Sequence, residues 1–523
     1  MQAEDDVQGK DNLNRRSIAS GPPQAGVDAP ATPKTGFARA GLSGSLFQVL
    51  GPADVERIHT AALQVLARTG LAIHDPAVLA LLGVAGCRLD QDQRRAWLPT
   101  DVVEGALKCA PPIVTLYDRL GRPAMVLGSG SLHVRTSSGA TGILDLDGGQ
   151  RREPNRQDAA DAARLADALP RIHGVSAMAV QPADVPASVA DLVSVRLALE
   201  NTVKPLGYVC LNEPLIDAVV ALAALVVGGE DALRRRPILT ALSESTSPLQ
   251  LVSSQLAVLR AFASRGLPLT LHAHPIAGLT APVTLAGELV ITHAEVLALA
   301  AISQLAHPGA PVIYGMSSSV PDMRSGANLS GAVEIGLLGA AVAQLARRCG
   351  LPCVMSSGTD APAPGPQLVL ERLMTLLPPA LAGVDLINLS SLHTKMTFSP
   401  EQLAFDAAVL GHVERLLRGM LVDDESLALD LIHQVGPGGA FVTEEHTLRH
   451  FRHELYIPDL IVRDPRQETG ERSRAREQVR RLLEEHRPSP VPDGILAQMD
   501  DVVEQAGFPA PARAWAGSVG ARR

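Results

Sequence analysis

The sequence predicts an α/β fold in which short strands and longer helices alternate through the middle of the chain. From about residue 131, the chain repeats a unit made of a short apolar segment, a Ser- or Gly-rich turn and an amphipathic run of helix length. The apolar segments are nearly continuous rather than alternating, which is typical of parallel strands covered by helices. Five of the eight segments begin with proline, which is tolerated at the first residue of a strand.

The unit occurs eight times. The expected strands are 132–136, 173–179, 205–210, 237–242, 268–272, 311–314, 352–356 and 385–389. The expected helices are 156–168, 185–200, 213–227, 249–265, 285–306, 330–349, 367–382 and 400–418. Eight strand–helix units close a (β/α)8 TIM barrel, which we place at 131–420. The alternative is a doubly wound open sheet, but Ser137–Gly142 matches its Gly-rich phosphate turn only weakly.

Helical segments are expected on both sides of the barrel. Residues 41–130 form an N-terminal helical lead-in, with apolar spacing that predicts helices near 52–69, 75–82 and 99–110. Residues 421–510 form a C-terminal helical appendix, with helices expected at 424–434, from about 444, at 470–486 and around 493–506. The Gly- and Pro-rich stretch 1–40 is predicted to be a disordered tail, and 511–523 a second tail.

Composition excludes several classes of protein. Hydrophobic residues make up 46% of the chain and charged residues 19%, so a large core can form. The net charge is −9 and no basic stripe is interleaved with aromatics, so we expect no nucleic-acid partner. The apolar run 218–227 is too short to span a bilayer, and we expect no membrane association. Five scattered cysteines without a CxxC pattern indicate a reducing, cytoplasmic location.

The barrel fold selects candidate functional residues, because loops after the carboxyl ends of the strands converge on one mouth. Polar side chains follow the last five expected strands: Glu244; His272 and His274; Tyr314 and Arg324; Ser356–Asp360; and His393 and Lys395. No Ser-His-Asp elbow, phosphate-binding loop or HExxH pattern is found. The mouth is therefore expected to be polar, rich in hydroxyls and of mixed charge.

His272 and His274 allow a second interpretation. At i and i+2 of a strand they point to the same face, so both can look into the barrel and could bind one metal ion. A metal-dependent hydrolase is therefore an alternative function. Our main expectation is that the chain has no tightly bound metal, and that the two imidazoles contact a polar substrate.

Several motifs occur in order along the chain. They are Thr246–Leu249, Pro282–Gly287, Ala294–Leu297, Pro311–Gly315, Asp322–Gly326 with Glu334, Thr359–Ala361, Met396–Leu403 and Val435–Gly439. Together they resemble, over roughly 45–505, the trimethylamine–corrinoid methyltransferase family, including its members that lack pyrrolysine and act on quaternary amines such as glycine betaine.

The resemblance implies a TIM barrel and a corrinoid-dependent methyltransferase. Its substrate would be a small quaternary or otherwise N-methylated amine, and its methyl acceptor the Co(I) of a corrinoid (cobalamin) carried by a partner protein. In the trimethylamine enzymes a pyrrolysine lies just before the Ser/Thr-Asp-Ala motif, and Gly358 matches that position. Glycine cannot supply the electrophilic imine that captures a tertiary amine, so the resemblance implies the non-pyrrolysine branch. We also expect a homo-oligomer.

The family motifs and the mouth residues together supply the candidate site. Gly358, Thr359, Asp360 and Glu244 are the candidate catalytic residues. The candidate substrate-binding residues are Tyr314, His272, His274, Arg324, His393, Lys395 and Phe398, with Tyr208 as a further aromatic candidate. The chain departs from the family pattern at 360–366 and 390–395. These departures allow a third interpretation, a non-catalytic homologue that binds a corrinoid protein.

Overall fold

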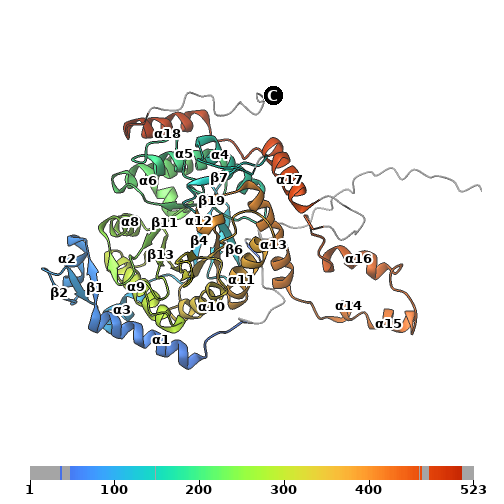
Figure 1. Cartoon of the computed structure of the whole chain (residues 1–523), viewed down its shortest axis with the longest axis horizontal. Helices are drawn as coiled ribbons and strands as arrows, with labels where there is room; N and C mark the ends of the chain where they lie inside the picture. The colour runs from blue at the N-terminus through green and yellow to red at the C-terminus, as the bar shows by residue number, and fades with distance from the viewer. Residues whose placement is uncertain (1–35, 38–46, 148, 459, 462–469, 509–523) are drawn as a thin grey trace, which may run out of the picture. The chain divides into compact units, whose positions relative to one another are not determined.

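The computed structural model describes residues 36–37, 47–147, 149–458, 460–461 and 470–508 (Figure 1). The tails expected at 1–40 and 511–523 lie outside the described residues, except for 36 and 37.

Eight parallel strands form one closed sheet. They are β6 (His133–Thr136), β9 (Val175–Ser176), β10 (Leu206–Val209), β11 (Leu239–Glu244), β13 (Leu269–Ala273), β14 (Val312–Met316), β17 (Cys353–Ser357) and β18 (Leu386–Leu389). The sheet order is β6-β18-β17-β14-β13-β11-β10-β9. A parallel bridge between Arg135 and Gly174 joins β6 to the start of β9 and closes the ring. The predicted barrel is therefore confirmed, and each observed strand overlaps its expected range.

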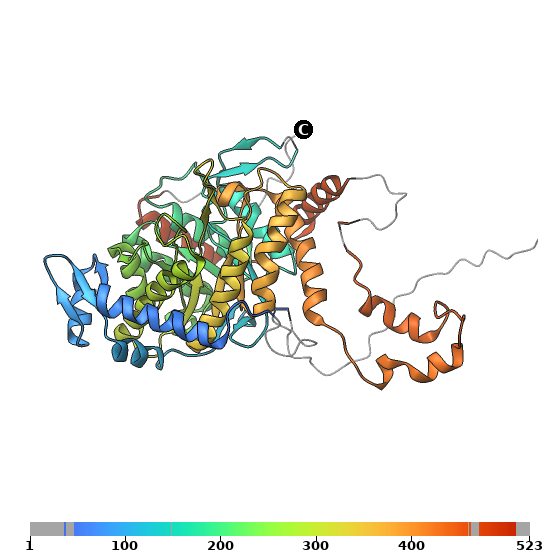
Figure 2. The same cartoon turned by 60° about the horizontal axis from the view of Figure 1, so that its bottom comes forward.

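The barrel helices lie outside the strands in both views (Figures 1 and 2). They are α4 (Arg156–Ala168), α5 (Ala190–Asn201), α6 (Ile216–Val227), α8 (Ser253–Ser264), α9 (Leu285–Ala306), α10 (Val333–Arg348), α11 (Pro366–Ala382) and α13 (Pro400–Arg418). A short additional helix, α7 (Glu230–Arg235), follows α6. The expected bounds of α4, α9 and α13 match the observed ones. Two of these helices begin at a capping side chain, α4 at a capping box on Asn155 and α13 at Ser399.

Helix α9 is long and apolar enough to cross a membrane by length and composition, but 72% of its most apolar window is buried inside the protein. It packs on β13 and β14 on one side and on α1 (Pro52–Gln64) and α3 (Thr100–Leu107) on the other. A helix that is apolar on all sides is typical of a core helix that other elements surround. The N-terminal segment therefore supplies the outer cover of α9.

The N-terminal segment contains strands as well as the three expected helices, α1, α2 (Pro76–Val84) and α3, so its description as a helical lead-in needs correction. The strands β1 (Leu71–Ile73), β2 (Arg88–Asp90) and β3 (Arg95–Trp97) form a small sheet with β12 (Gln250–Leu251). Runs of three residues show no readable periodicity. In addition, β1 depends on β12, a partner far away in the sequence.

A β-hairpin closes the amino-terminal end of the barrel. It consists of β4 (Val114–Tyr117) and β5 (Pro123–Leu127), and its buried face is formed by Val114, Leu116, Met125 and Leu127. These side chains pack on Ile313, Val354 and Leu386, which lie near the starts of three barrel strands. The barrel interior is thus filled at this end by apolar side chains, and polar side chains can enter only from the carboxyl end.

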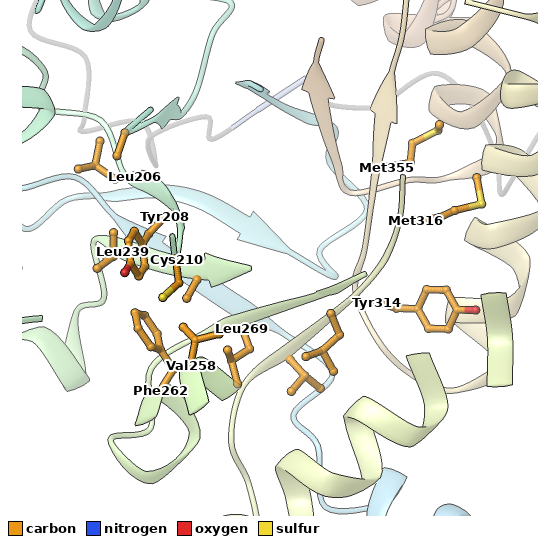
Figure 3. Packing of buried hydrophobic residues seen from close by; sticks show 14 of the residues in the cluster. Leu206, Tyr208, Cys210, Leu239, Val258, Phe262, Leu269, Tyr314, Met316 and Met355 are labelled. Carbon is orange, nitrogen blue, oxygen red and sulfur yellow. The ribbon is translucent and has the colours of Figure 1, made fainter. Parts of the chain in front are cut away.

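The core between strands and helices uses few aromatics. Tyr208 and Phe262 lie nearly parallel, with ring centroids 6.3 Å apart, between β10 and α8 (Figure 3). Elsewhere the contact faces are largely alanine, as along α4, whose buried residues include Ala159, Ala160 and Ala166. Small side chains let helices approach the strands closely, which fits a chain that is 3% aromatic.

The C-terminal segment is helical in its described parts. Its helices are α14 (Asp424–Leu427), α15 (Leu429–Val435), α16 (Glu445–Glu454), α17 (Glu471–Glu485) and α18 (Asp493–Gln505). Helix α17 packs on α13 and α4, and α18 packs on α5 and α6. Helices α17 and α18 therefore cover the last barrel helix, α13, and the first three, α4, α5 and α6.

A buried arginine ties together the carboxyl ends of the last two barrel strands. Arg372 on α11 pairs with Asp406 on α13 through Nε and Oδ1 at 2.8 Å, and both side chains are almost fully buried. Its Nη1 donates to the carbonyl of Ser357, and its Nη2 donates to the carbonyl of Ser390 at 2.6 Å. One guanidinium thus positions the loops that follow β17 and β18.

We expect Arg372→Met to destabilise the protein by about 3–5 kcal/mol, because Asp406 is left buried without its partner. Guanidinium unfolding of the variant and the wild type measures the difference. The matched control is Arg449→Met, which breaks the exposed pairs with Glu425 and Glu445 and should leave the unfolding midpoint unchanged. Equal unfolding midpoints for the two variants would show that the buried Arg372–Asp406 pair does not stabilise the fold.

Candidate active site

A cavity of about 260 Å³ lies at the carboxyl ends of the barrel strands. Residues from, or just beyond, each of the eight strands line it, so it occupies the mouth that the sequence predicts. Of the expected site residues, Glu244, His272, His274 and Lys395 line this cavity. The structure therefore brings together four residues from three separate strand ends.

Arg135, on β6, lies buried on the wall of the cavity. Its Nε donates to Asn388 Oδ1 at 3.1 Å and its Nη1 to Thr240 Oγ1 at 2.8 Å. Both of these partners are neutral oxygens, and burial lowers the pKa of Arg135 to about 10. A Cβ on Gly207, which lies on β10 two strands away around the ring, would be 2.6 Å from Arg135 Nη1, so this glycine leaves the space that the guanidinium occupies.

Sequence reasoning missed Arg135 because it lies within a strand and not after one. The signal that could have found it is an arginine in the otherwise apolar expected strand 132–136. A buried arginine bonded only to neutral oxygens still carries its charge at neutral pH. It therefore offers an unneutralised cation to whatever enters the cavity.

The two histidines at the carboxyl end of β13 are uncharged at neutral pH. Burial, together with the charges of Arg135 and Lys395, lowers the pKa of His272 to about 3. Burial and the charge of Lys395 likewise lower the pKa of His274 to about 3. The Nε2 of His272 has no hydrogen-bond partner within the described chain, and a Cβ on Gly315 would lie 2.1 Å from this ring. Gly315 thus makes room for an imidazole that has a free polar atom.

Glu244 and Lys395 influence one another across the mouth. Burial raises the pKa of Glu244, and the charge of Lys395 opposes this shift. Burial lowers the pKa of Lys395, and Glu244 opposes that shift in turn. The Lys395 ammonium donates to Ser317 Oγ at 2.6 Å. The cavity therefore holds one carboxylate and two cationic side chains, Arg135 and Lys395.

Lys395 reaches the cavity from a strained turn. His393, Thr394 and Lys395 have φ values of 48°, 53° and 77°, a run of left-handed residues that is rare outside glycine. The loop after β17 holds this turn: Thr394 Oγ1 donates to Asp360 Oδ1 at 2.8 Å, and the Thr394 amide donates to the carbonyl of Thr359 at 3.1 Å. The turn falls within 390–395, one of the segments where the chain departs from the family pattern.

The expected catalytic residues Thr359 and Asp360 do not line the cavity. The Thr359 hydroxyl donates to Glu371 Oε2 at 2.7 Å, and the Asp360 carboxylate accepts from the amides of Ser330 and Gly331 at 2.8 and 2.9 Å. Thr359 and Asp360 thus form hydrogen bonds that link three loops. Through Asp360 these bonds hold the turn that carries Lys395.

Gly358 stands where no side chain fits. A Cβ there would lie 1.9 Å from the carbonyl oxygen of Ser330. The backbone around this position therefore excludes any larger residue, including a pyrrolysine. Gly358 itself does not line the cavity.

The structure does not bring the other expected residues to the cavity. Tyr314 points outward from β14, where its hydroxyl is 2.8 Å from His293 Nδ1 (Figure 3). Its neighbours Ile313 and Gly315 take the inward positions because strand residues alternate. Arg324 and His393 are exposed, and the His393 ring lies 3.2 Å from Thr397 Oγ1.

Phe398 and Tyr208 are the last two candidate residues expected from the sequence. Phe398, on β19 (Thr397–Phe398), is buried and lines a separate small pocket with Ile143 and Leu144. Tyr208 borders the cavity, but its hydroxyl donates to Asp191 Oδ2 at 3.2 Å and its ring packs on Phe262. No aromatic cage is thus assembled from these residues.

The fold and cavity define a TIM-barrel protein with a closed amino-terminal end and a polar cavity at its mouth. Residues 31–507 match the family model described as Trimethylamine methyltransferase (MTTB). The chain belongs to this family and is a methyltransferase.

Three comparisons illustrate the similarity. The trimethylamine methyltransferase MttB of Desulfitobacterium hafniense is 32% identical over 477 residues, which cover 90% of this chain and 94% of the relative. The glycine betaine methyltransferase of the same species is 31% identical over 475 residues, covering 88% and 97%. Among solved structures, the monomethylamine methyltransferase MtmB of Methanosarcina barkeri aligns over 85% of this chain and 96% of its own, at 12% identity and a TM-score of 0.43.

We expect the neutral state of His272 to make the fold sensitive to acid. The unfolded imidazole takes up a proton near pH 6.5 and the folded one only at about pH 3, so stability is present above about pH 6.5 and is lost as the pH falls. Between about pH 7 and pH 5, the wild type should lose about 2 kcal/mol more unfolding free energy than His272→Gln. Urea titrations at the two pH values measure the unfolding free energy of both proteins. If the wild type and His272→Gln lose the same amount, His272 is protonated in the folded state.

Proposed function

We propose that the protein transfers a methyl group from a small quaternary amine that also carries a carboxylate to a corrinoid on a partner protein. The observation that supports this substrate class most directly is the charge pattern of the cavity. Arg135 and Lys395 offer two cations to an anionic group, and Glu244 offers one carboxylate to a quaternary ammonium. A betaine combines both charges in one small molecule.

Arg135 is the group that suits the substrate carboxylate. A guanidinium that already donates to Asn388 and Thr240 is held in place before the ligand arrives, so little side-chain entropy is lost on binding. Glu244 would stabilise the ammonium. The neutral rings of His272 and His274 add hydrogen-bonding atoms without adding positive charge beside the cationic nitrogen.

Gly358 supports a quaternary substrate over a tertiary one. The position that resembles the pyrrolysine site has no space for a side chain, so the chain has no imine there to capture trimethylamine. A quaternary nitrogen already provides a good leaving group, because it departs as a neutral amine. What this chain then supplies is orientation of the N–CH₃ bond and exclusion of water.

Thr359 and Asp360 act in this proposal as positioning residues. Their hydrogen bonds to Thr394 hold the strained turn, and the turn directs Lys395 into the cavity. The two altered segments, 360–366 and 390–395, meet at this contact. Their departure from the family pattern is therefore consistent with a rebuilt pocket, and the non-catalytic alternative is not needed to explain it.

The cavity has space for the amine but not for a corrinoid. A volume of about 260 Å³ suits a small molecule, whereas a corrin macrocycle is several times larger. This volume supports a site for the methyl donor alone, with the corrinoid presented at the mouth by a partner protein. The reduced corrinoid supplies a Co(I) nucleophile that accepts the methyl group.

The test is a demethylation assay with reduced cob(I)alamin and three substrates. We expect a demethylated amine from glycine betaine, less product from tetramethylammonium, which lacks a carboxylate, and none from trimethylamine. Chromatography of the product amine measures the outcome. Turnover of trimethylamine, or no product from any quaternary amine, would contradict the proposal.

The Arg135→Met variant examines the carboxylate contact in the same assay. Loss of a charged hydrogen bond should raise KM for glycine betaine about 10–100-fold. The KM for tetramethylammonium, which has no carboxylate, should not change, so it serves as the control within each preparation. Arg324→Met, at an exposed loop arginine, should change neither value. Equal losses for both substrates would show a structural role for Arg135 instead.

We also propose that the protein is a cytoplasmic homo-oligomer that assembles through residues 420–461. Large apolar side chains in this segment are strongly exposed in the single chain, among them Met420 at 80%, Val442 at 78% and Leu448 at 73%. Apolar surface of this extent is typical of a protein interface. No disulfide joins any two of the five cysteines, which is consistent with a reducing compartment.

Sedimentation velocity tests the assembly. The wild type should sediment as a dimer or larger species at micromolar concentration. Leu448→Glu places a charge among the exposed apolar side chains and should shift the protein towards monomer, while Arg452→Glu on the same helix serves as the charge-changing control. A monomeric wild type would refute the proposal.

A further inference from the structure

A second group of chemically active side chains lies outside the barrel interior. His59 on α1, His293 on α9 and Cys349 at the end of α10 each offer a ligand atom, and these atoms all lie within 4.8 Å of one another. Both histidines are buried, at 2% and 0% exposure. The three residues come from distant parts of the chain, which is why no metal-ligand spacing is visible in the sequence.

The outer nitrogen of each imidazole already has a partner. His59 Nε2 is 2.7 Å from Glu104 Oε1, and His293 Nδ1 is 2.8 Å from the Tyr314 hydroxyl. Histidines that bind metal usually hydrogen-bond through the other ring nitrogen to a carboxylate or similar group, which fixes the tautomer and the ring orientation. Here the pairing leaves His59 Nδ1 and His293 Nε2 facing each other at 2.8 Å.

A hydrogen-bonded pair of imidazoles accounts for that distance without a metal, but it does not account for a third ligand at the same point. The Cys349 thiol adds a sulfur to two imidazole nitrogens in a partly enclosed site. Two nitrogens and one sulfur suit Zn²⁺ and not Mg²⁺ or Ca²⁺, which prefer oxygen.

We propose that His59, His293 and Cys349 bind one zinc ion that fastens the N-terminal helix α1 to the barrel helices α9 and α10. Two nitrogens at ordinary Zn–N distances in a tetrahedral site lie about 3.3 Å apart, so the rings need to separate by only about half an ångström. A water molecule would supply the fourth ligand of the tetrahedral site. Glu104 also balances the charge of the nearby Arg348, at 3.7 Å.

The proposal gives Tyr314 a different role. This residue is a poor substrate contact because it points away from the cavity, but it orients a zinc ligand through His293. The zinc would connect α1, α9 and α10 directly and β14 through Tyr314. The site is independent of the methyl-transfer proposal, because none of its residues lines the cavity.

Metal content of the full-length protein tests the site. Protein purified without chelator and dialysed against buffer with trace zinc should contain about one zinc per chain by mass spectrometry. Cys349→Ser and His293→Gln should each reduce this at least fivefold, whereas the matched variants Cys109→Ser and His307→Gln should not. Circular dichroism verifies that each variant is folded.

Cobalt substitution provides a second readout in case a variant fails to fold. Co²⁺ bound to the wild type should show a thiolate-to-metal charge-transfer band that Cys349→Ser lacks. Chelator should lower the melting temperature of the wild type and leave that of Cys349→Ser unchanged. Wild-type protein with less than half an equivalent of zinc, or without the cobalt–thiolate band, would overturn the proposal.

Discussion

Closure of the sheet between β6 and β9 is the constraint on which the rest of the structure depends. The Arg135–Gly174 bridge completes the ring, so every strand has two neighbours and the interior becomes a confined space. The hairpin β4–β5 fills the amino-terminal end of that space with apolar side chains. Polar chemistry is thereby restricted to the carboxyl ends of the strands.

Confinement explains the glycines that face the interior. Arg135 and His272 can lie inside the barrel because Gly207, two strands away from Arg135, and Gly315, on the strand next to His272, have no side chains. The same burial shifts the pKa of His272 and His274 downward, whereas Arg135 keeps its charge because guanidinium is intrinsically so basic. Packing therefore decides which of the interior groups are charged.

The mouth depends on contacts made outside the barrel. Arg372 holds the carbonyls at the ends of β17 and β18, and Asp360 holds the turn that carries Lys395. Thr359 and Asp360 are candidates because Thr359–Ala361 resembles the family motif. In the structure their side chains bond to Glu371, Ser330, Gly331 and Thr394 and do not line the cavity.

The sequence by itself determined the eight strand–helix units, the barrel they form and four residues at its mouth. It could do so because strand ends and helix starts depend on short local stretches of sequence. It also pointed to the family through motifs in order. Only the tertiary structure decided that Arg135 lines the cavity, that Tyr314 faces outward and that His59, His293 and Cys349 meet. The physical reason is that local periodicity gives the direction of a side chain relative to its own element. Which distant side chains share a space depends on how the ring closes and how the N-terminal helices pack on it.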